Sequence, residues 1–234
     1  MKNQAINSRI FMVGFLALAF AFAQAGAQET RDLEPFTGIG VAISADVSYT
    51  TGNAYSITIE GNERDVEDLI TEVEGGKLKV KYENNWRVKR SKLTIHIISR
   101  ELDHISLSGS ADILVEKVLS AEEFRLAISG SGTVTIPGLE CEELDVHISG
   151  SGTSTIKKGN AEEMDVKISG SGKLQAEDLA VEEFSVSISG SGSVRVTVKD
   201  ELEARIAGSG SVYYHGNPVV NSSSSGSGKV RSLD

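Results

Sequence analysis

Polar and apolar residues alternate over long stretches of this chain. Between Phe124 and Ile136 every second residue is apolar or glycine, and the residues between them are mostly polar. A period of two is typical of strands with one buried face, because successive side chains on a strand point to opposite sides. Gly130 and Gly132 occupy two of the inward-facing positions in the middle of this stretch, which predicts a tight turn with no room for a β-carbon. The parity breaks at paired glutamates such as Glu142-Glu143, which predicts another corner.

The alternating stretch recurs along the chain at a nearly constant step. Seven serine-glycine turns follow one another at steps of 21, 20, 20, 20, 18 and 18 residues: Ser108–Ser110, Ser129–Gly132, Ser149–Gly152, Ser169–Gly172, Ser189–Gly192, Ala207–Gly210 and Ser225–Gly228. A fixed period of this size indicates a repeat architecture in which each unit packs only on its neighbours.

A unit of 20 extended residues is about 66 Å long, enough for one coil folded at two or three corners. Coils stacked at about 4.8 Å would bury columns of equivalent residues. We expect one such column to contain Phe124, Leu144, Met164, Phe184 and Leu202. A propeller blade is excluded because it needs about 40 residues. The predicted fold is all-β, a parallel β-helix or β-solenoid of ~20-residue coils.

Residues 28–104 precede the regular repeat and are less uniform. Alternating apolar residues predict strands at 39–47, 55–59, 78–82 and 93–97, with turns at 51–53 and 61–62 and a loop at Asn84-Asn85. The apolar residues of 65–73 recur at helical spacing, so we expect one short helix that ends at Gly75-Gly76. This strand-rich module should cap the first coil, since an open solenoid end exposes unpaired strand edges. At the other end, the polar tract Asn221–Ser225 predicts a frayed last coil.

Residues 1–27 have the pattern of a secretory signal peptide. Lys2 and Arg9 form a basic start, an apolar run follows, and Ala25-Gly26-Ala27 is a small-residue cleavage site. The apolar run is shorter than the ~20 residues of a membrane span. We therefore expect three parts: a signal peptide at 1–27, a capping part at 28–104, and a repeat solenoid at 105–234 that is continuous with the capping part in one domain. The protein would be exported, to the periplasm or to the cell surface and beyond.

Charge limits the partners of the exported chain. Loss of two of the 23 basic side chains with the signal peptide leaves 21 against 33 acidic ones, a formal net charge of −12. Such a chain is a poor ligand for nucleic acid or anionic lipid, and no membrane span remains after cleavage. The partner could be an envelope component, a glycan or a protein. The sequence does not determine the oligomeric state. The single cysteine, Cys141, shares the inward position of Ala121 and Ala161, which favours a small buried residue over a reactive thiol.

Paired acidic residues recur at one corner of the coils. Stacking would align them in two columns, in which like charges repel by roughly 1 kcal/mol per pair even at the dielectric of water. Solvation and counterions would offset this repulsion; the alternative is calcium, which collects carboxylate oxygens. We define the acidic corner, a candidate binding site, as Glu142, Glu143, Glu162, Glu163, Glu182 and Glu183. The calcium-binding β-roll has aspartate in its glycine-rich turn, and these turns have none, so no metal or cofactor is assigned.

Catalysis finds little support in the sequence. Carbohydrate-active β-helices need carboxylates clustered on one face, whereas the outward positions here differ from coil to coil. His147, with Asp145, Asp165 and Lys167, is the nearest to a polar constellation, and the other histidines show no ligand spacing. The Ser-Gly-Ser-Gly turns lack the strand-to-helix context of a nucleophile elbow, and no helix or lysine follows them as in a phosphate loop. No catalytic residue is predicted.

Several segments carry a resemblance to a known family. Phe36–Val41, Asp46-Val47, the segment Thr71–Val80 and the later Ser-Gly-Ser turns resemble the head GIN domain family, also called putative auto-transporter adhesins. The likeness covers about residues 33–230, and Gly38-Ile39-Gly40 stands where the family name has Gly-Ile-Asn. The resemblance implies an exported β-solenoid-like protein.

These observations lead to one expectation about function and two alternatives. We expect an exported, non-catalytic β-solenoid that acts as a binding, adhesin-like or envelope structural module. A carbohydrate-active β-helix enzyme is the first alternative. A cation-dependent structural module, in which the acidic corner binds calcium, is the second.

Overall fold

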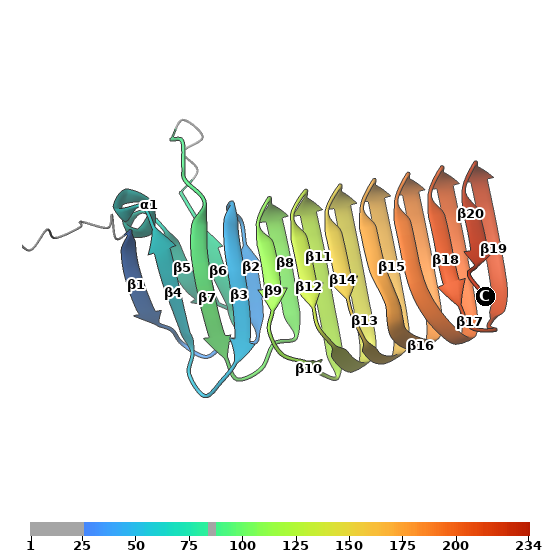
Figure 1. Ribbon diagram of the computed structural model, residues 1–234, viewed down its shortest axis with the longest axis horizontal. Helices are drawn as coiled ribbons and strands as arrows, with labels where there is room; N and C mark the ends of the chain where they lie inside the picture. The colour runs from blue at the N-terminus through green and yellow to red at the C-terminus, as the bar shows by residue number, and fades with distance from the viewer. Residues whose placement is uncertain (1–25, 84–87) are drawn as a thin grey trace, which may run out of the picture.

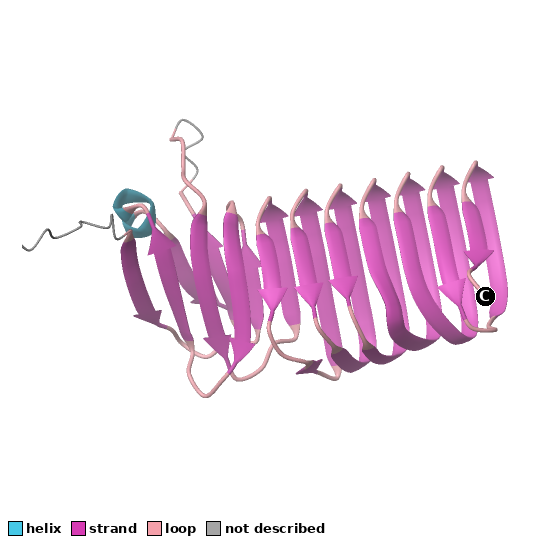
Figure 2. Ribbon diagram, viewed as in Figure 1, coloured by secondary structure: helices cyan, strands magenta, loops and turns pink. Residues whose placement is uncertain are grey.

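The structure is a computed structural model that describes residues 26–83 and 88–234. Within these ranges it shows a flattened β-solenoid, in which one sheet of twenty strands folds into two layers that face each other across a core (Figures 1 and 2). The signal peptide expected at 1–27 lies outside the described residues except for its last two positions. The loop expected at Asn84-Asn85 also lies outside them.

The two layers carry different outward side chains, and we call them the serine face and the threonine face after these side chains. The serine face consists, in order along the stack, of β5 (Ile70–Glu74), β6 (Lys77–Lys81), β2 (Gly38–Val41), β8 (His104–Gly109), β11 (Glu123–Gly130), β13 (Leu139–Gly150), β15 (Gly159–Gly170), the later parts of β16 (Lys173–Gly190) and β17 (Ser193–Gly208), and β19 (Val219–Gly226). The threonine face consists of β1 (Ala27–Asp32), β4 (Ser56–Gly61), β7 (Leu93–Ser99), β3 (Ala45–Thr51), β9 (Asp112–Val115), β12 (Thr133–Ile136), β14 (Thr153–Ile156), the first parts of β16 and β17, β18 (Ser211–His215) and β20 (Lys229–Ser232). β10 (Leu119–Ser120) is a short strand at the bend between the faces.

The predicted parallel stacking is confirmed. β11, β13, β15 and β16 pair in register, each residue beside its equivalent 20 positions along the chain. The column Phe124, Leu144, Met164, Phe184 and Leu202 is buried, with each side chain at most 2% exposed. Burying equivalent apolar residues above one another is what stabilises a solenoid, since each coil has little core of its own.

The two glycines of each Ser-Gly turn from Ser129 onward serve different purposes. Gly150 has a φ of +113°, a conformation that side chains other than glycine rarely adopt. Gly152 is buried, and a β-carbon there would lie 2.4 Å from Cγ2 of Ile128 in the coil below. The first glycine therefore permits the backbone turn, and the second leaves room for the core beneath it.

The coils are not stacked in the order of the chain. β2 pairs with β6 on one side and β8 on the other, and β3 pairs with β7 and β9. The coil formed by residues 38–51 therefore lies between the coils of 77–99 and 104–115, as the blue strands between green ones show in Figure 1. Simple stacking in chain order, which the sequence favours, does not hold in this part.

The N-terminal end of the stack is covered, as expected. β1, β4 and β5 pair antiparallel with their neighbours, and α1 (Glu63–Glu67) packs against β1 and β4. The side chain of Arg31 in β1 donates hydrogen bonds to the carbonyl oxygens of Val66 (2.9 Å) and Leu69 (2.6 Å), which holds α1 in place. The cap closes the core, because Val66 and Leu69 are both buried.

The helix expected over 65–73 is wrong in its second half. α1 ends at Glu67, and Ile70–Glu74 is strand β5, paired antiparallel with β6. Gly75 and Gly76 have φ of +59° and +74°, which fits a two-residue hairpin turn that matches strand twist rather than a helix end. The spacing of Val66, Leu69, Ile70 and Val73 matches a helix, and the antiparallel pairing of residues 70–74 with β6 overrides this local pattern.

The C-terminal coil is ordered, so the expectation of fraying is wrong. β19 pairs with β17 along its whole length, and β20 pairs with β18. Ser222 and Ser224 occupy the positions of the buried Ala204 and Ile206 one coil earlier. The polar tract thus finishes the core with hydroxyl groups that water can solvate.

Candidate functional site

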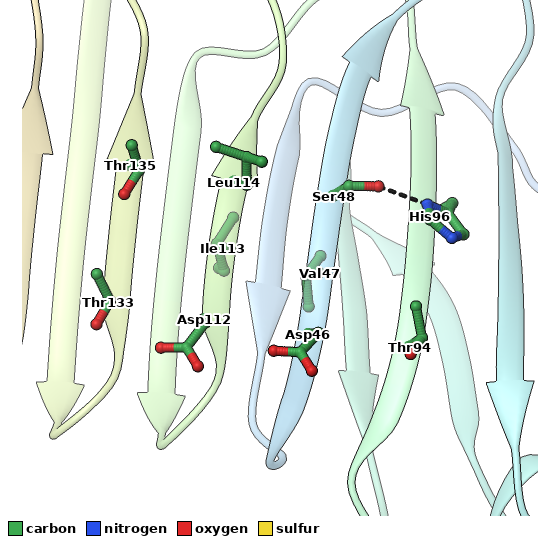
Figure 3. Close-up of a pocket in the computed structure, with 10 residues that line it drawn as sticks. All are labelled: Asp46, Val47, Ser48, Thr94, His96, Asp112, Ile113, Leu114, Thr133 and Thr135. Atoms are coloured by element: carbon green, nitrogen blue, oxygen red, sulfur yellow. Dashed lines mark hydrogen bonds between the residues drawn. The ribbon is translucent and has the colours of Figure 1, made fainter.

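A hollow of about 440 Å³ lies on the threonine face, over strands β7, β3, β9 and β12 (Figure 3). Eight outward side chains surround it in two rows, each row crossing the four strands in register. One row is Thr94, Asp46, Asp112 and Thr133; the other is His96, Ser48, Leu114 and Thr135. Ser48 is small and stands between the larger His96 and Leu114, which accounts for the depression.

Ser48 and His96 are joined across two strands. A hydrogen bond of 2.5 Å links Ser48 Oγ to His96 Nδ1. The strand pairing places these residues directly opposite each other, although 48 positions separate them in the chain. The bond holds the imidazole ring as one wall of the hollow, and Leu114, which is 49% exposed, forms the opposite wall.

Lys92 orients the two carboxylates at the edge of the hollow. Its Nζ lies 2.6 Å from Asp46 Oδ1 and 3.2 Å from Asp112 Oδ2. Both contacts raise the pKa of Lys92 above its ordinary value, Asp46 first, so this amine keeps its charge. Two carboxylates and one ammonium leave an excess of one negative charge, which disfavours anionic ligands here.

The hollow contains a hydrogen-bonded Ser48–His96 pair and several further hydroxyl groups. No carboxylate hydrogen-bonds to His96 among the described residues, so nothing orients it as the base of a triad. Hydroxyl groups on Ser48, Thr94, Thr133 and Thr135 can each donate and accept. The surface that they line together with Val47, Ile113 and Leu114 is nevertheless predominantly apolar.

The acidic corner is exposed where the sequence placed it. Glu143, Glu163 and Glu183 stand in register on successive coils, and Glu142, Glu162 and Glu182 are exposed beside them. Glu163 and Glu183 line a shallow hollow of about 280 Å³ together with Asp165, Glu201 and Glu203. Lys199 Nζ lies 3.3 Å from Glu182 Oε1 and offsets part of the charge. Within 26–83 and 88–234, no group of three or more His, Cys, Asp or Glu residues is placed to hold a metal ion.

The other residues that the sequence singled out, His147 with its neighbours and Cys141, lie on the serine face and near the bend. His147 and Lys167 pair in register beside Asp145 and Asp165, with the small Ala127 and Ser187 flanking them around a hollow of about 420 Å³. Cys141 is half-buried beside Ala161, as its inward position predicts. Burial, and then the charge of Glu140, raises the pKa of its thiol to about 12, so it stays protonated and unreactive.

Sequence reasoning missed the hollow on the threonine face. Its residues come from 46–48, 94–96, 112–114 and 133–135, and only the last two segments are one repeat apart. Segments 46–48 and 94–96 lie beside segments 112–114 and 133–135 because β3 lies between β7 and β9. The alternation of Asp46 and Ser48 with buried residues showed that they point outward, but no signal in the chain showed which strands flank them.

The model of a family described as "Putative auto-transporter adhesin, head GIN domain" matches residues 35–218. No curated protein matches. No helix in the described part of the chain is long and apolar enough to cross a membrane.

Solved structures share the fold. A putative adhesin from Bacteroides fragilis is 24% identical with a TM-score of 0.83, over 88% of this chain and 96% of that chain. One from Parabacteroides merdae is 24% identical with a TM-score of 0.73, over 91% and 98%. A putative lipid binding protein from Parabacteroides distasonis is 22% identical with a TM-score of 0.72, also over 91% and 98%. At these identities the likeness concerns the fold.

Proposed function

Because the chain belongs to the head GIN domain family of putative auto-transporter adhesins, we propose that it is an exported, non-catalytic binding module whose ligand rests in the hollow of the threonine face. The expected signal peptide supports export to the periplasm or the cell surface. We assign residues 28–104 to an N-terminal part that comprises the cap and the coils of 38–51 and 77–99, and residues 105–234 to the regular repeat solenoid.

The observation that carries this proposal is the two-row array around the hollow. Eight outward side chains from four strands meet there in register, and Lys92 and the Ser48–His96 bond hold several of them in place. A volume of about 440 Å³ is within the range of small-ligand sites, and side chains on paired strands form a rigid surface. Rigid side chains lose little entropy when a ligand binds.

The same geometry supports the proposal that the module is non-catalytic. The Ser48–His96 pair has no orienting carboxylate in the described ranges, and Asp46 and Asp112 are both bound to Lys92. Neither carboxylate is placed as a free general acid or base. The site therefore favours recognition without chemical change.

Binding of residues 28–234 to arrays of glycans and proteins tests the proposal. The variant Leu114→Arg should abolish the signal by filling the hollow with a charged side chain. Val118→Arg is the matched control, because Val118 is also 49% exposed but does not line the hollow. Absence of any ligand would reject the binding function, whereas a signal that survives Leu114→Arg would reject this site.

A second candidate function rests on the acidic corner. Five carboxylates, from Glu163, Asp165, Glu183, Glu201 and Glu203, surround the hollow of about 280 Å³ there. This concentration of negative charge favours a cationic ligand or a stabilising divalent ion. The calcium experiment in the Discussion distinguishes the two surfaces.

A further inference from the structure

We propose that the C-terminal end of the solenoid is an interface through which two copies of this chain join end to end. β19 and β20 are the last strands of the two faces, at the red end of the stack in Figure 1, and among the described residues they pair only with β17 and β18. Their outer edges therefore carry backbone N–H and C=O groups without a partner strand. Such edges are templates for pairing with another chain.

Apolar side chains gather at this end. Five large apolar side chains are exposed in the described part of the chain, and three of them belong to the last coil: Val219 (68%), Val220 (38%) and Leu233 (39%). Val220 stands over the buried Leu202 and continues its column. Each interior coil buries this column against the next coil, so the last coil presents the same kind of surface uncovered.

The edges at the opposite end of the stack are protected. β1 and β5 also pair on one side only among the described residues, but α1 packs against β1. Charged side chains on an edge strand oppose pairing with another chain. β19 contains no charged residue, whereas β1 and β5 carry Glu29, Arg31, Asp32, Glu72 and Glu74. Since only the C-terminal end is open to pairing, association stops at two copies.

A second copy covers this end more completely than a single peptide strand does. The end presents two edges at once, one on each face, with apolar side chains between them. One peptide strand would pair with one edge and leave the other edge and the core exposed. The same end of another copy presents two strands at the same separation. A contact between identical surfaces is closed by a two-fold axis.

Charge decides which strands meet. β20 carries Lys229 and Arg231, so pairing it with the partner's β20 would place like charges side by side. Pairing β19 with the partner's β20 avoids this repulsion and places the two-fold axis along the strands, which makes the pairing antiparallel. When the turns and the inward positions are aligned, Ser225 lies opposite the partner's Lys229 and Ser223 opposite the partner's Arg231.

The first test is sedimentation of residues 28–234 over a range of concentrations. β19 and β20 supply eight and four edge residues, a small interface, so we expect a monomer–dimer equilibrium with a dissociation constant on the order of 10 μM. Ser222→Lys with Ser224→Lys should weaken association at least about tenfold, because both serines are exposed in the single copy but face the interface. Ser149→Lys, at an exposed serine of an interior coil, is the matched control. Melting curves check that all variants fold.

The second test is disulfide cross-linking in a Cys141→Ala background, since alanine occupies the equivalent position Ala161. Ser225→Cys with Lys229→Cys should give a covalent dimer on oxidation. The two positions lie on opposite faces of one copy, so they cannot bridge within it. Either substitution alone should leave the chain uncross-linked.

Each contrary outcome rejects a different part of the inference. A monomer at every concentration rejects the interface, and species that grow beyond the dimer reject the closed contact. A dimer that Ser222→Lys with Ser224→Lys leaves intact lies elsewhere on the molecule, and cross-linking by Ser225→Cys alone rejects the pairing of β19 with β20. None of these variants touches the hollow of the threonine face, so ligand binding there is tested separately.

Discussion

A β-carbon on Gly150 would lie 2.6 Å from the carbonyl oxygen of Gly130 in the coil below. That oxygen already accepts a hydrogen bond of 2.9 Å from the backbone N–H of Ser151, so it cannot move away without breaking the ladder. The same relationship recurs from coil to coil, with Gly170 over Gly150 and Gly190 over Gly170. The spacing between coils thus leaves no room for a side chain at this turn.

Gly150→Val should destabilise the fold by about 3 kcal/mol or more, because it adds a clash to a φ of +113°. For a domain of this size the thermal midpoint should fall by about 6–12 °C. Ser151→Ala, which keeps the backbone hydrogen bond, should change stability by less than about 0.5 kcal/mol. Melting curves that rank the two variants the other way would show that the turn has space for a side chain.

Ser154→Val should raise stability by about 1 kcal/mol, or about 2–4 °C in the thermal midpoint. Ser154 is fully buried between Val134 and Leu174, and its hydroxyl has no hydrogen-bond partner among residues 26–83 and 88–234. Valine removes the unsatisfied group and fills the same column as its neighbours. Thr155→Val, on the partly exposed side of β14, is the control. A lower midpoint for both Ser154→Val and Ser154→Ala would mean that the hydroxyl is satisfied after all.

Asp65→Asn should destabilise the cap near neutral pH and lose its effect in acid. Burial alone would raise the pKa of Asp65, but hydrogen bonds from the backbone N–H of Ser91 (2.9 Å) and from Arg90 (3.1 Å) outweigh it and hold the pKa below its usual value. A lowered pKa in the folded state adds stability above the unfolded pKa of about 3.9, and this stability disappears as pH falls through the folded pKa. Thermal midpoints of both proteins measured from pH 7 downward should therefore converge below about pH 4. A constant difference over the whole range would contradict the role of the charge.

No turnover is expected on pectic, alginate-like or peptidoglycan-derived substrates. On the serine face, Arg125 lies 3.5 Å from Asp145, and this ion pair occupies one carboxylate that catalysis would need. Release of product, measured by reducing-end and chromatographic assays, would contradict this expectation. Its loss on changing Asp145, His147, Asp165 or Ser48 would then locate the active site.

Calcium should stabilise the protein no more than magnesium does at equal ionic strength. The carboxylates of the acidic corner are exposed, so screening by any cation relieves their repulsion. Glu142→Gln with Glu162→Gln should slightly raise the thermal midpoint without divalent ions, since like charges this close repel by roughly 1 kcal/mol. A rise specific to calcium and absent from the double variant would support the cation-dependent alternative instead.

The regular part of this fold is readable from the chain because each coil repeats the one before it. The buried column from Phe124 to Leu202 follows directly from the parity of the repeat. Prediction fails where strand pairing overrides a local pattern. Ile70 and Val73 have helical spacing, but pairing with Lys77–Lys81 places them in a strand.

The candidate site was harder to predict than the fold. Its two rows depend on β3 lying between β7 and β9, and strand order among irregular segments is a property of the whole chain. The acidic corner, by contrast, was found because its residues repeat with the coils. A periodic sequence therefore allows a surface that repeats with the coils to be predicted, but not a surface that occurs once.

The intercalated coil of residues 38–51 has a consequence for the order of assembly. β2 and β3 precede all of their partner strands in the chain, because β2 pairs with β6 and β8, and β3 pairs with β7 and β9. Such distant pairings close slowly, because the chain between them must be ordered first. The later coils can then add one at a time to a finished edge, as each pairs only with its predecessor. Residues 38–51 can therefore complete their strand pairing only after the neighbouring coils, residues 77–99 and 104–115, have been synthesised.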